Sequence, residues 1–179
     1  SGAYCTFANN GVFVKPYFVS SIEDENGRVI YRAVKEEQVA LPPKANAVMV
    51  DMLKYTAVGF GDYKSQVGGK TGTTNDYKDG WFIGITPSLV VGTWVGGEDQ
   101  WIRFNTLADG QGSVMAKPFF KAFLRRLENS PEVDYDATTK FAVPEGGLDI
   151  ETDCAKYNAI RRDNTLEQFN PEETYQEEF

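Results

Sequence analysis

The 179-residue chain contains no histidine. This absence excludes a catalytic relay in which an imidazole takes a proton from a serine or cysteine of the same chain. It also removes the commonest side-chain ligand of protein-bound metals. We therefore expect no metal site and no cofactor.

Cysteine and long apolar runs are also scarce. Cys5 and Cys154 are the only cysteines, and they allow either one disulfide or two free thiols, of which two buried free thiols is the preferred interpretation. No apolar run reaches the roughly 18 residues that span a bilayer, and no signal-peptide pattern opens the chain. Because the chain starts at Ser1 inside an expected helix, we interpret it as part of a longer parent protein.

Basic residues are not in excess, since the formal net charge is -8. Residues 131–179 carry 13 acidic and 4 basic side chains, whereas residues 1–130 are close to neutral. Neither part has the basic surface of a nucleic-acid-binding protein. We predict a folded body, residues 1–130, and an acidic C-terminal tail, residues 131–179. In that tail we expect Phe141 to Ile150 to lie back on the body. We expect residues beyond about Tyr157 to be mobile, because few apolar groups offset the entropy of ordering.

Three segments have the apolar spacing of helices. The first ends at Asn10-Gly11, where glycine accepts the left-handed conformation that stops a helix. The second, Ala45 to Val58, has an apolar stripe formed by Val48, Met49, Met52 and Leu53. The third, Val114 to Leu127, directs Phe119, Phe120, Phe123, Leu124 and Leu127 inward.

The remaining regular segments have the composition of strands. Tyr17 to Val19 and Val29 to Tyr31 flank Asn26-Gly27, a strong hairpin signal. Three further strands, residues 65–74, 80–86 and 89–96, are joined by short links and therefore predict an antiparallel meander. The sequence thus indicates an α+β fold, an antiparallel sheet with packed helices.

The first strand of the meander contains Lys70-Thr71-Gly72-Thr73. Alternate residues share a face, so Lys70 and Gly72 point one way and Thr71 and Thr73 the other. Such a glycine-rich edge can accept an extended peptide as an added strand, and its backbone N–H groups can stabilise an oxyanion. Lys70 supplies positive charge, and threonine hydroxyls bind carboxylates. A Lys-Thr-Gly triplet alone is short, and a glycine-rich edge strand without function has the same sequence.

The longer stretch GGKTGTTNDYKDGWFIGITPSLVVGTWVG is far more specific. It closely resembles the class A penicillin-binding proteins of the 1A type, which are bifunctional peptidoglycan glycosyltransferase/transpeptidases. The resemblance extends upstream to AYCTFANNGVFVKPYFVSSIEDENGRVIY and downstream to Ala116-Lys117-Pro118, and so covers about residues 1–130. It implies the C-terminal portion of the β-lactamase/transpeptidase-like fold.

The same resemblance implies roles for the residues of the motif. Lys70 would help to orient and activate the nucleophile, and the backbone of Thr73 would contribute to the oxyanion hole and pair with the substrate strand. The hydroxyls of Thr71 and Thr73 would lie near the substrate, with Thr73 the better candidate for binding a carboxylate, and Gly72 would leave space for it. The implied partners are peptidoglycan stem peptides and β-lactam antibiotics. The implied location is the periplasmic face of the bacterial inner membrane, with the anchor outside this chain.

The chain departs from the family pattern in one decisive respect. None of its seven serines is followed by lysine three residues later or by asparagine two residues later. We therefore expect the Ser-x-x-Lys nucleophile to lie upstream in the parent protein, and this chain alone to be inactive. Two alternatives stay open, namely a fragment of a serine β-lactamase and a non-catalytic cell-wall-binding module. Asp79 and Trp81 are interpreted as a loop residue and a core residue.

Overall fold

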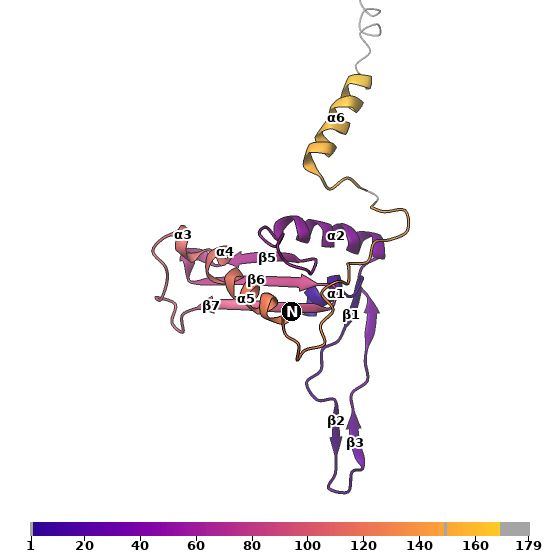
Figure 1. Ribbon diagram of the computed structural model, residues 1–179, viewed down its shortest axis with the longest axis vertical. Coiled ribbons are helices and arrows are strands. Elements are labelled where there is room, and N and C mark those ends of the chain that lie inside the picture. Colours follow the sequence, from indigo (N-terminus) through magenta and orange to yellow (C-terminus); the bar gives the residue numbers. More distant parts are fainter. Residues whose placement is uncertain (1, 149, 169–179) are drawn as a thin grey trace, which may run out of the picture.

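A three-stranded antiparallel sheet lies at the centre of the molecule (Figure 1). The computed structural model describes residues 2–148 and 150–168. The strands are β5 (Gly68–Thr73), β6 (Asp79–Thr86) and β7 (Leu89–Gly96), in the order β5-β6-β7. The predicted meander is confirmed, and Pro87 and Ser88 form the turn between β6 and β7.

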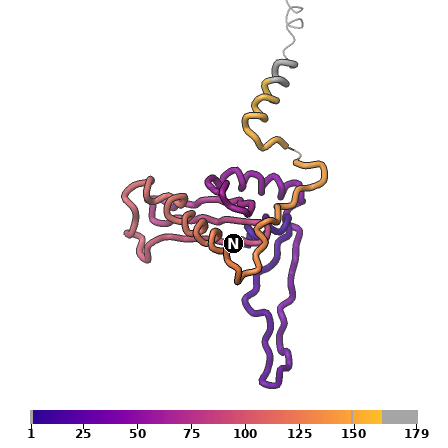
Figure 2. Tube along the Cα trace, viewed as in Figure 1, coloured from indigo at the N-terminus to yellow at the C-terminus, as the bar shows by residue number. Residues whose placement is uncertain are grey.

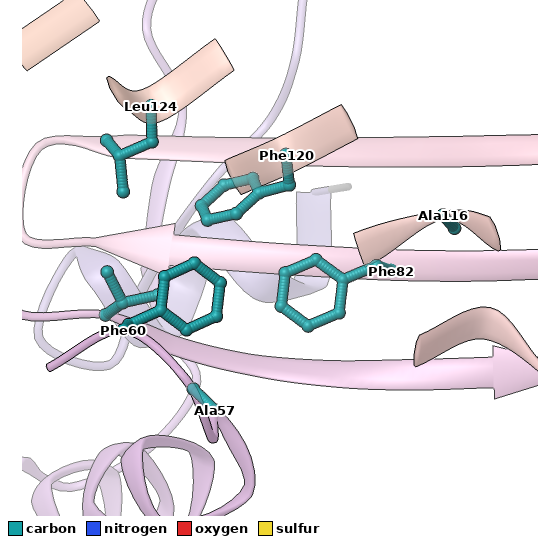
Figure 3. Packing of buried hydrophobic residues seen from close by; sticks show 7 residues of the cluster. Ala57, Phe60, Phe82, Ala116, Phe120 and Leu124 are labelled. Atoms are coloured by element: carbon teal, nitrogen blue, oxygen red, sulfur yellow. The ribbon is translucent and has the colours of Figure 1, made fainter. Parts of the chain in front are cut away.

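Two helices cover one face of this sheet. They are α4 (Gly112–Met115) and α5 (Lys117–Glu128), and a short helix, α3 (Leu107–Gly110), precedes them. Phe82 of β6 lies among aromatic and aliphatic side chains from α5 and from the segment before β5 (Figure 3). This cluster consists of Ala57, Phe60, Val67, Phe82, Ala116, Phe120 and Leu124. Burial of each large apolar side chain stabilises the fold by roughly 1.5–3 kcal/mol.

The predicted helix from Val114 to Leu127 is divided in two. Helix α4 ends at Met115 and α5 begins at Lys117, so that Pro118 stands in the first turn of α5, where its missing N–H costs no hydrogen bond. Phe120 and Leu124 are buried as predicted. Phe119 and Phe123 are exposed, because each lies about 100° around the helix from its buried neighbour.

A second cluster occupies the other face of the sheet. Helix α2 (Pro43–Thr56) runs beside β5, and α1 (Gly2–Ala8) lies against β6 and β7 (Figure 1). Val50, Leu53, Ile85 and Phe141 form this cluster, with Tyr4, Phe7 and Val90 packed against it. Helix α1 is followed by Asn10 and Gly11, both with positive φ, so the predicted stop is confirmed.

The apolar stripe predicted for α2 is confirmed at Leu53 and wrong at Met49 and Met52. The buried residues are Asn46, Ala47, Val50 and Leu53, whereas Met49 and Met52 are exposed. The helix carries apolar side chains on two neighbouring stripes, so periodicity alone did not distinguish the face that contacts the sheet.

Four short strands form a long arm below the sheet (Figures 1 and 2). Strand β1 (Val12–Val14) pairs with β4 (Glu37–Val39), and β2 (Ser21–Glu23) pairs with β3 (Val29–Arg32). The hairpin is confirmed, but its first strand is not Tyr17 to Val19, and the β1–β4 ladder was not predicted. The turn is held by the Asp24 carboxylate, which accepts hydrogen bonds from two backbone N–H groups.

The chain after α5 returns across the body. Tyr135 is hydrogen-bonded to Ser65 and Thr86 (3.0 Å each), and the Phe141 N–H donates to Gln66 Oε1 (3.0 Å). Phe141 itself is buried, whereas Val143 and Ile150 are exposed. The prediction that Phe141 to Ile150 lie back on the body is therefore confirmed at Phe141.

Beyond this return, α6 (Cys154–Gln168) extends away from the sheet (Figure 1), and this helix was not predicted. Residues 169–179 lie outside the described residues, and the mobility of the end of the tail stays a prediction. Cys5 and Cys154 are free thiols. Both are exposed rather than buried, because Cys5 lies on the outer side of α1 and Cys154 starts an exposed helix.

Candidate active-site strand

Strand β5 has one open edge. Its neighbour on one side is β6, and no further strand pairs with it within the described residues. The Thr56 hydroxyl of α2 donates to Gly69 O (2.6 Å), and Lys70 Nζ donates to Thr71 O (3.0 Å). Both carbonyls therefore face away from β6. Because backbone groups alternate in direction along an antiparallel strand, Thr73 also turns its N–H and C=O toward the open edge.

The side chains of the motif divide between the two faces as predicted. Lys70 pairs with Ile83 and Gly72 with Trp81 on one face, whereas Thr71 pairs with Phe82 on the face that carries α4 and α5. The Lys70 side chain is exposed. In the part of the chain that the structure describes, no carboxylate lies within salt-bridge distance of its ammonium. Its positive charge is thus available to a group outside the sheet.

Thr73 ends the strand at the mouth of a cavity. Its Oγ1 accepts a hydrogen bond from the Gly112 N–H of α4 (3.0 Å). The cavity has a volume of about 790 Å³ and lies between the β5–β6 turn and the segment that precedes α3. Its lining residues are Thr73, Thr74, Asn75, Asp76, Tyr77, Arg103, Phe104, Asn105 and Leu107.

A strained and charged turn lines one part of this cavity. Asp76 and Tyr77 have φ of 59° and 58°, which is a costly conformation for residues with a Cβ. The Asp76 carboxylate lies 3.7 Å from Lys78 Nζ and 3.9 Å from Arg103. Arg103 was not predicted as a site residue, because residues 98–112 show no periodicity. The turn with Asp76 and Tyr77 belongs to the stretch that carried the family resemblance.

Asp79 and Trp81 lie on the turn and on the strand that follows it. Asp79 closes the turn, because its N–H donates to Thr74 Oγ1 (2.8 Å) and its carboxylate accepts from Trp94 Nε1 (3.1 Å). The prediction that Trp81 is a core residue is wrong, since 45% of it is exposed. Trp81 packs against Trp94 of β7, with ring centroids 6.4 Å apart, on the same face as Lys70.

The described residues include no group of three acidic, cysteine or histidine side chains arranged to hold a metal ion. No helix among the described residues combines the length and the apolar composition needed to cross a membrane.

Comparisons with known proteins identify the family to which this chain belongs. Residues 1–125 match the family described as "Penicillin binding protein transpeptidase domain". Penicillin-binding protein 1A of Aquifex aeolicus is 42% identical over 101 residues, which are 54% of this chain and 14% of that protein. Penicillin-binding protein 1A of Rickettsia prowazekii is 34% identical over 197 residues, which are 94% of this chain and 24% of that protein. The chain thus spans a quarter or less of the length of these relatives.

Solved structures show the same architecture. Penicillin-binding protein 1A of Haemophilus influenzae aligns with a TM-score of 0.59 at 22% identity, over 82% of this chain and 30% of that chain. PonA1 of Mycobacterium tuberculosis aligns with a TM-score of 0.57 at 25% identity, over 80% of this chain and 43% of that chain. The chain therefore belongs to the penicillin-binding protein transpeptidase family and carries the C-terminal part of that domain.

Proposed function

We propose that β5 is one wall of a D-alanyl-D-alanine transpeptidase site in a peptidoglycan-synthesising parent protein. The observation that carries this proposal is the open edge of β5. There the backbone groups of Thr71 and Thr73 face outward beside the Lys70 ammonium, which has no acidic partner among the described residues.

An extended stem peptide would pair with this edge as an added strand. A serine of the parent would attack the carbonyl between the two D-alanines and form an ester, with release of the terminal D-alanine. An amine of a neighbouring stem peptide would then attack the ester, form the cross-link and free the serine. The outward N–H of Thr73 is suited to stabilise the oxyanion of each step.

Lys70 and the threonines complete this wall. The Lys70 ammonium would orient the nucleophile and favour negative charge at the reacting centre. Thr71 and Thr73 would bind the terminal carboxylate, and Gly72 leaves the strand surface bare beside them. A β-lactam would acylate the same serine. Penicillin-binding protein A of Mycobacterium tuberculosis, which shares this fold with a TM-score of 0.53 at 22% identity, has been solved as an imipenem acyl-enzyme complex.

The parent protein would carry a peptidoglycan glycosyltransferase domain and would be anchored at the periplasmic face of the inner membrane. This part of the proposal is supported by the 1A-type relatives, of which the chain covers 14–24%.

Covalent labelling with a fluorescent penicillin tests the proposal. The 179-residue chain, which has no Ser-x-x-Lys element, should remain unlabelled, whereas the parent protein should be labelled at the serine of that element. Labelling of the isolated chain would contradict its predicted inactivity. A parent protein that takes no label but binds peptidoglycan would indicate a non-catalytic module, and rapid hydrolysis of nitrocefin would indicate a β-lactamase.

A further inference from the structure

Gly112 approaches the active-site strand more closely than any residue with a side chain allows. Its N–H donates to Thr73 Oγ1 at 3.0 Å. A Cβ at Gly112 would stand 2.4 Å from Gly72 O and 2.5 Å from Trp81 O, well inside van der Waals contact. Glycine therefore lets the start of α4 lie directly on the β5–β6 ladder.

Other contacts fix α4 in this position. The Met115 side chain fills the space over Gly80, where a Cβ would lie 2.6 Å from Met115 Cγ. The Thr93 hydroxyl of β7 lies 3.1 Å from both Phe82 O and Ala116 O and ties the end of α4 to the sheet. Contacts with all three strands of the sheet thus fix the position of α4, and with it the position of the Gly112 N–H.

The hydrogen bond from the Gly112 N–H determines which further hydrogen bonds the Thr73 hydroxyl can form. A threonine hydroxyl has one hydrogen to donate and two lone pairs that accept. The Gly112 N–H occupies a lone pair, and no acceptor for the Thr73 hydrogen lies within hydrogen-bond distance among the described residues. Thr73 is exposed and lines the cavity at the end of β5, so its hydrogen is free to point toward a ligand there.

The charges around this hydroxyl favour an anionic ligand at the open edge. The Lys70 ammonium stands on the same strand, on its other face, without an acidic partner in the described residues. Arg103 lines the same cavity as Thr73. Asp76 lines it too, and its single carboxylate is shared by Arg103 and Lys78. These three side chains together therefore keep a net positive charge. A carboxylate accepts hydrogen bonds only, and a hydroxyl that donates to it forms a short, charge-assisted bond.

We infer that Gly112 is a positioning residue for the carboxylate-binding group Thr73. Its N–H occupies one acceptor site of Thr73 and thereby turns the hydroxyl hydrogen toward the carboxylate of the stem peptide or β-lactam. This inference rests on the proposed function. It predicts that Gly112 affects the recognition of the carboxylate through Thr73 alone.

The readout is a ratio that a purely structural role would not change. In the parent protein, the second-order acylation rate is measured with a penicillin and with its methyl ester, which lacks the carboxylate charge. Thr73→Val should lower the ratio of these rates roughly 10- to 100-fold, the range expected for one hydrogen bond to a charged group. Thr73→Ser, which keeps the hydroxyl, should retain most of the ratio.

Gly112→Ala should lower the ratio to a similar extent and should have no further effect on it in a Thr73→Val background. Since this variant risks misfolding, a second variant replaces residue 112 by glycolic acid through semisynthesis. That change exchanges the N–H for an oxygen, adds no atom, and should lower the ratio like Thr73→Val. Gly61→Ala, at a glycine with open space around it, is the control.

An unchanged ratio in the glycolate variant would overturn the inference and leave the proposed function standing. A further loss when Gly112→Ala is added to Thr73→Val would also overturn it, because Gly112 would then act by another route. A wild-type parent protein that penicillin does not acylate would overturn both.

Discussion

The Lys70 ammonium lies on the exposed face of an edge strand and donates to the carbonyl of the next residue, Thr71 (3.0 Å). At least four other lysines are paired with a carboxylate, among them Lys15 with Glu36 (3.2 Å) and Lys54 with Asp51 (3.4 Å). A lysine that holds no structural contact with another element can be replaced at little cost to folding.

The first prediction follows from this isolation. In the parent protein, Lys70→Ala should reduce the rate of acylation by penicillin about 10²- to 10⁴-fold, the usual contribution of a positioned acid–base group. The unfolding midpoint should not change. Lys15→Ala, which removes an exposed lysine on the arm, should leave the acylation rate unchanged. An acylation rate of Lys70→Ala equal to that of the wild type would refute the proposed role.

A second single-residue prediction concerns pH. Hydrogen bonds from the Thr138 and Thr139 hydroxyls (2.6 Å each) and from the Thr138 N–H (2.7 Å) hold the pKa of the Asp136 carboxyl at about 2, below its ordinary value of 3.8. A lowered pKa means that the ionised form is favoured by the fold. Its stabilising contribution is present above pH 3.8 and is lost as the pH falls toward 2.

NMR titration of the carboxyl carbon should therefore give an Asp136 midpoint near 2. In Asp136→Asn, the urea midpoint should fall less between pH 5 and pH 2 than in the wild type. A titration midpoint near 4 would show that the two threonines do not stabilise the charge.

At the scale of elements, α5 is joined to the sheet through aromatic rings that meet in tilted and edge-to-face contacts. Phe120 lies 5.2 Å from Phe82 and 5.6 Å from Phe60, measured between ring centroids. Gly84 of β6 makes this arrangement possible, because a Cβ there would lie 2.3 Å from Phe120 Cζ. The Phe120 ring rests directly on the backbone of the strand.

The third prediction tests this contact. Gly84→Ala should force Phe120 out of its position and lower the free energy of unfolding by about 1–3 kcal/mol, the range for overpacked cores. Gly61→Ala, where nothing lies within 4 Å of the added atom, is the matched control and should change it by less than about 0.5 kcal/mol. Urea unfolding of the 179-residue chain measures both, and equal effects would contradict the close packing of Phe120 on Gly84.

At the scale of the whole molecule, the returning segment attaches the acidic tail to the body. Phe141 packs among Val50, Leu53 and Ile85, and the Thr152 hydroxyl donates to the Asp51 carboxylate of α2 (2.5 Å). The division into a body of residues 1–130 and a tail of residues 131–179 stays a prediction. These contacts indicate that the first part of the tail contributes to the stability of the body.

The fourth prediction measures that contribution. Phe141→Ala should destabilise the chain by about 3–5 kcal/mol, as expected for truncation of a buried phenylalanine. Val143→Ala, two residues away and 74% exposed, should cost less than about 0.5 kcal/mol. If urea unfolding gives the same free energy for both variants, the return of the tail does not stabilise the body.

Local sequence signals predicted the meander and the helices α1, α2 and α5, but not α6, the β1–β4 ladder or the contacts between elements. The meander was predictable because its strands follow one another with short links, and the motif residues lie on one of them. The buried face of α2 was not predictable, because the exposed Met49 and the buried Val50 are neighbours and both are apolar. The contact of Gly112 with Thr73 joins residues 39 positions apart. A local sequence pattern cannot show that residue 112 must be glycine, because the strand that leaves no room for a side chain there is distant in the sequence.

The face of the sheet that carries Lys70 also carries two of the three tryptophans. Trp81 and Trp94 are 45% and 48% exposed, and Trp101 is 78% exposed. With all three indoles in contact with water, the chain should fluoresce at long wavelength, as unfolded proteins do. Any partner or polypeptide segment that covers the Trp81–Trp94 face should shift this emission to the blue, and Trp101→Phe should preserve the shift. Trp81 and Trp94 would thus report by fluorescence on any group that covers the candidate active-site strand.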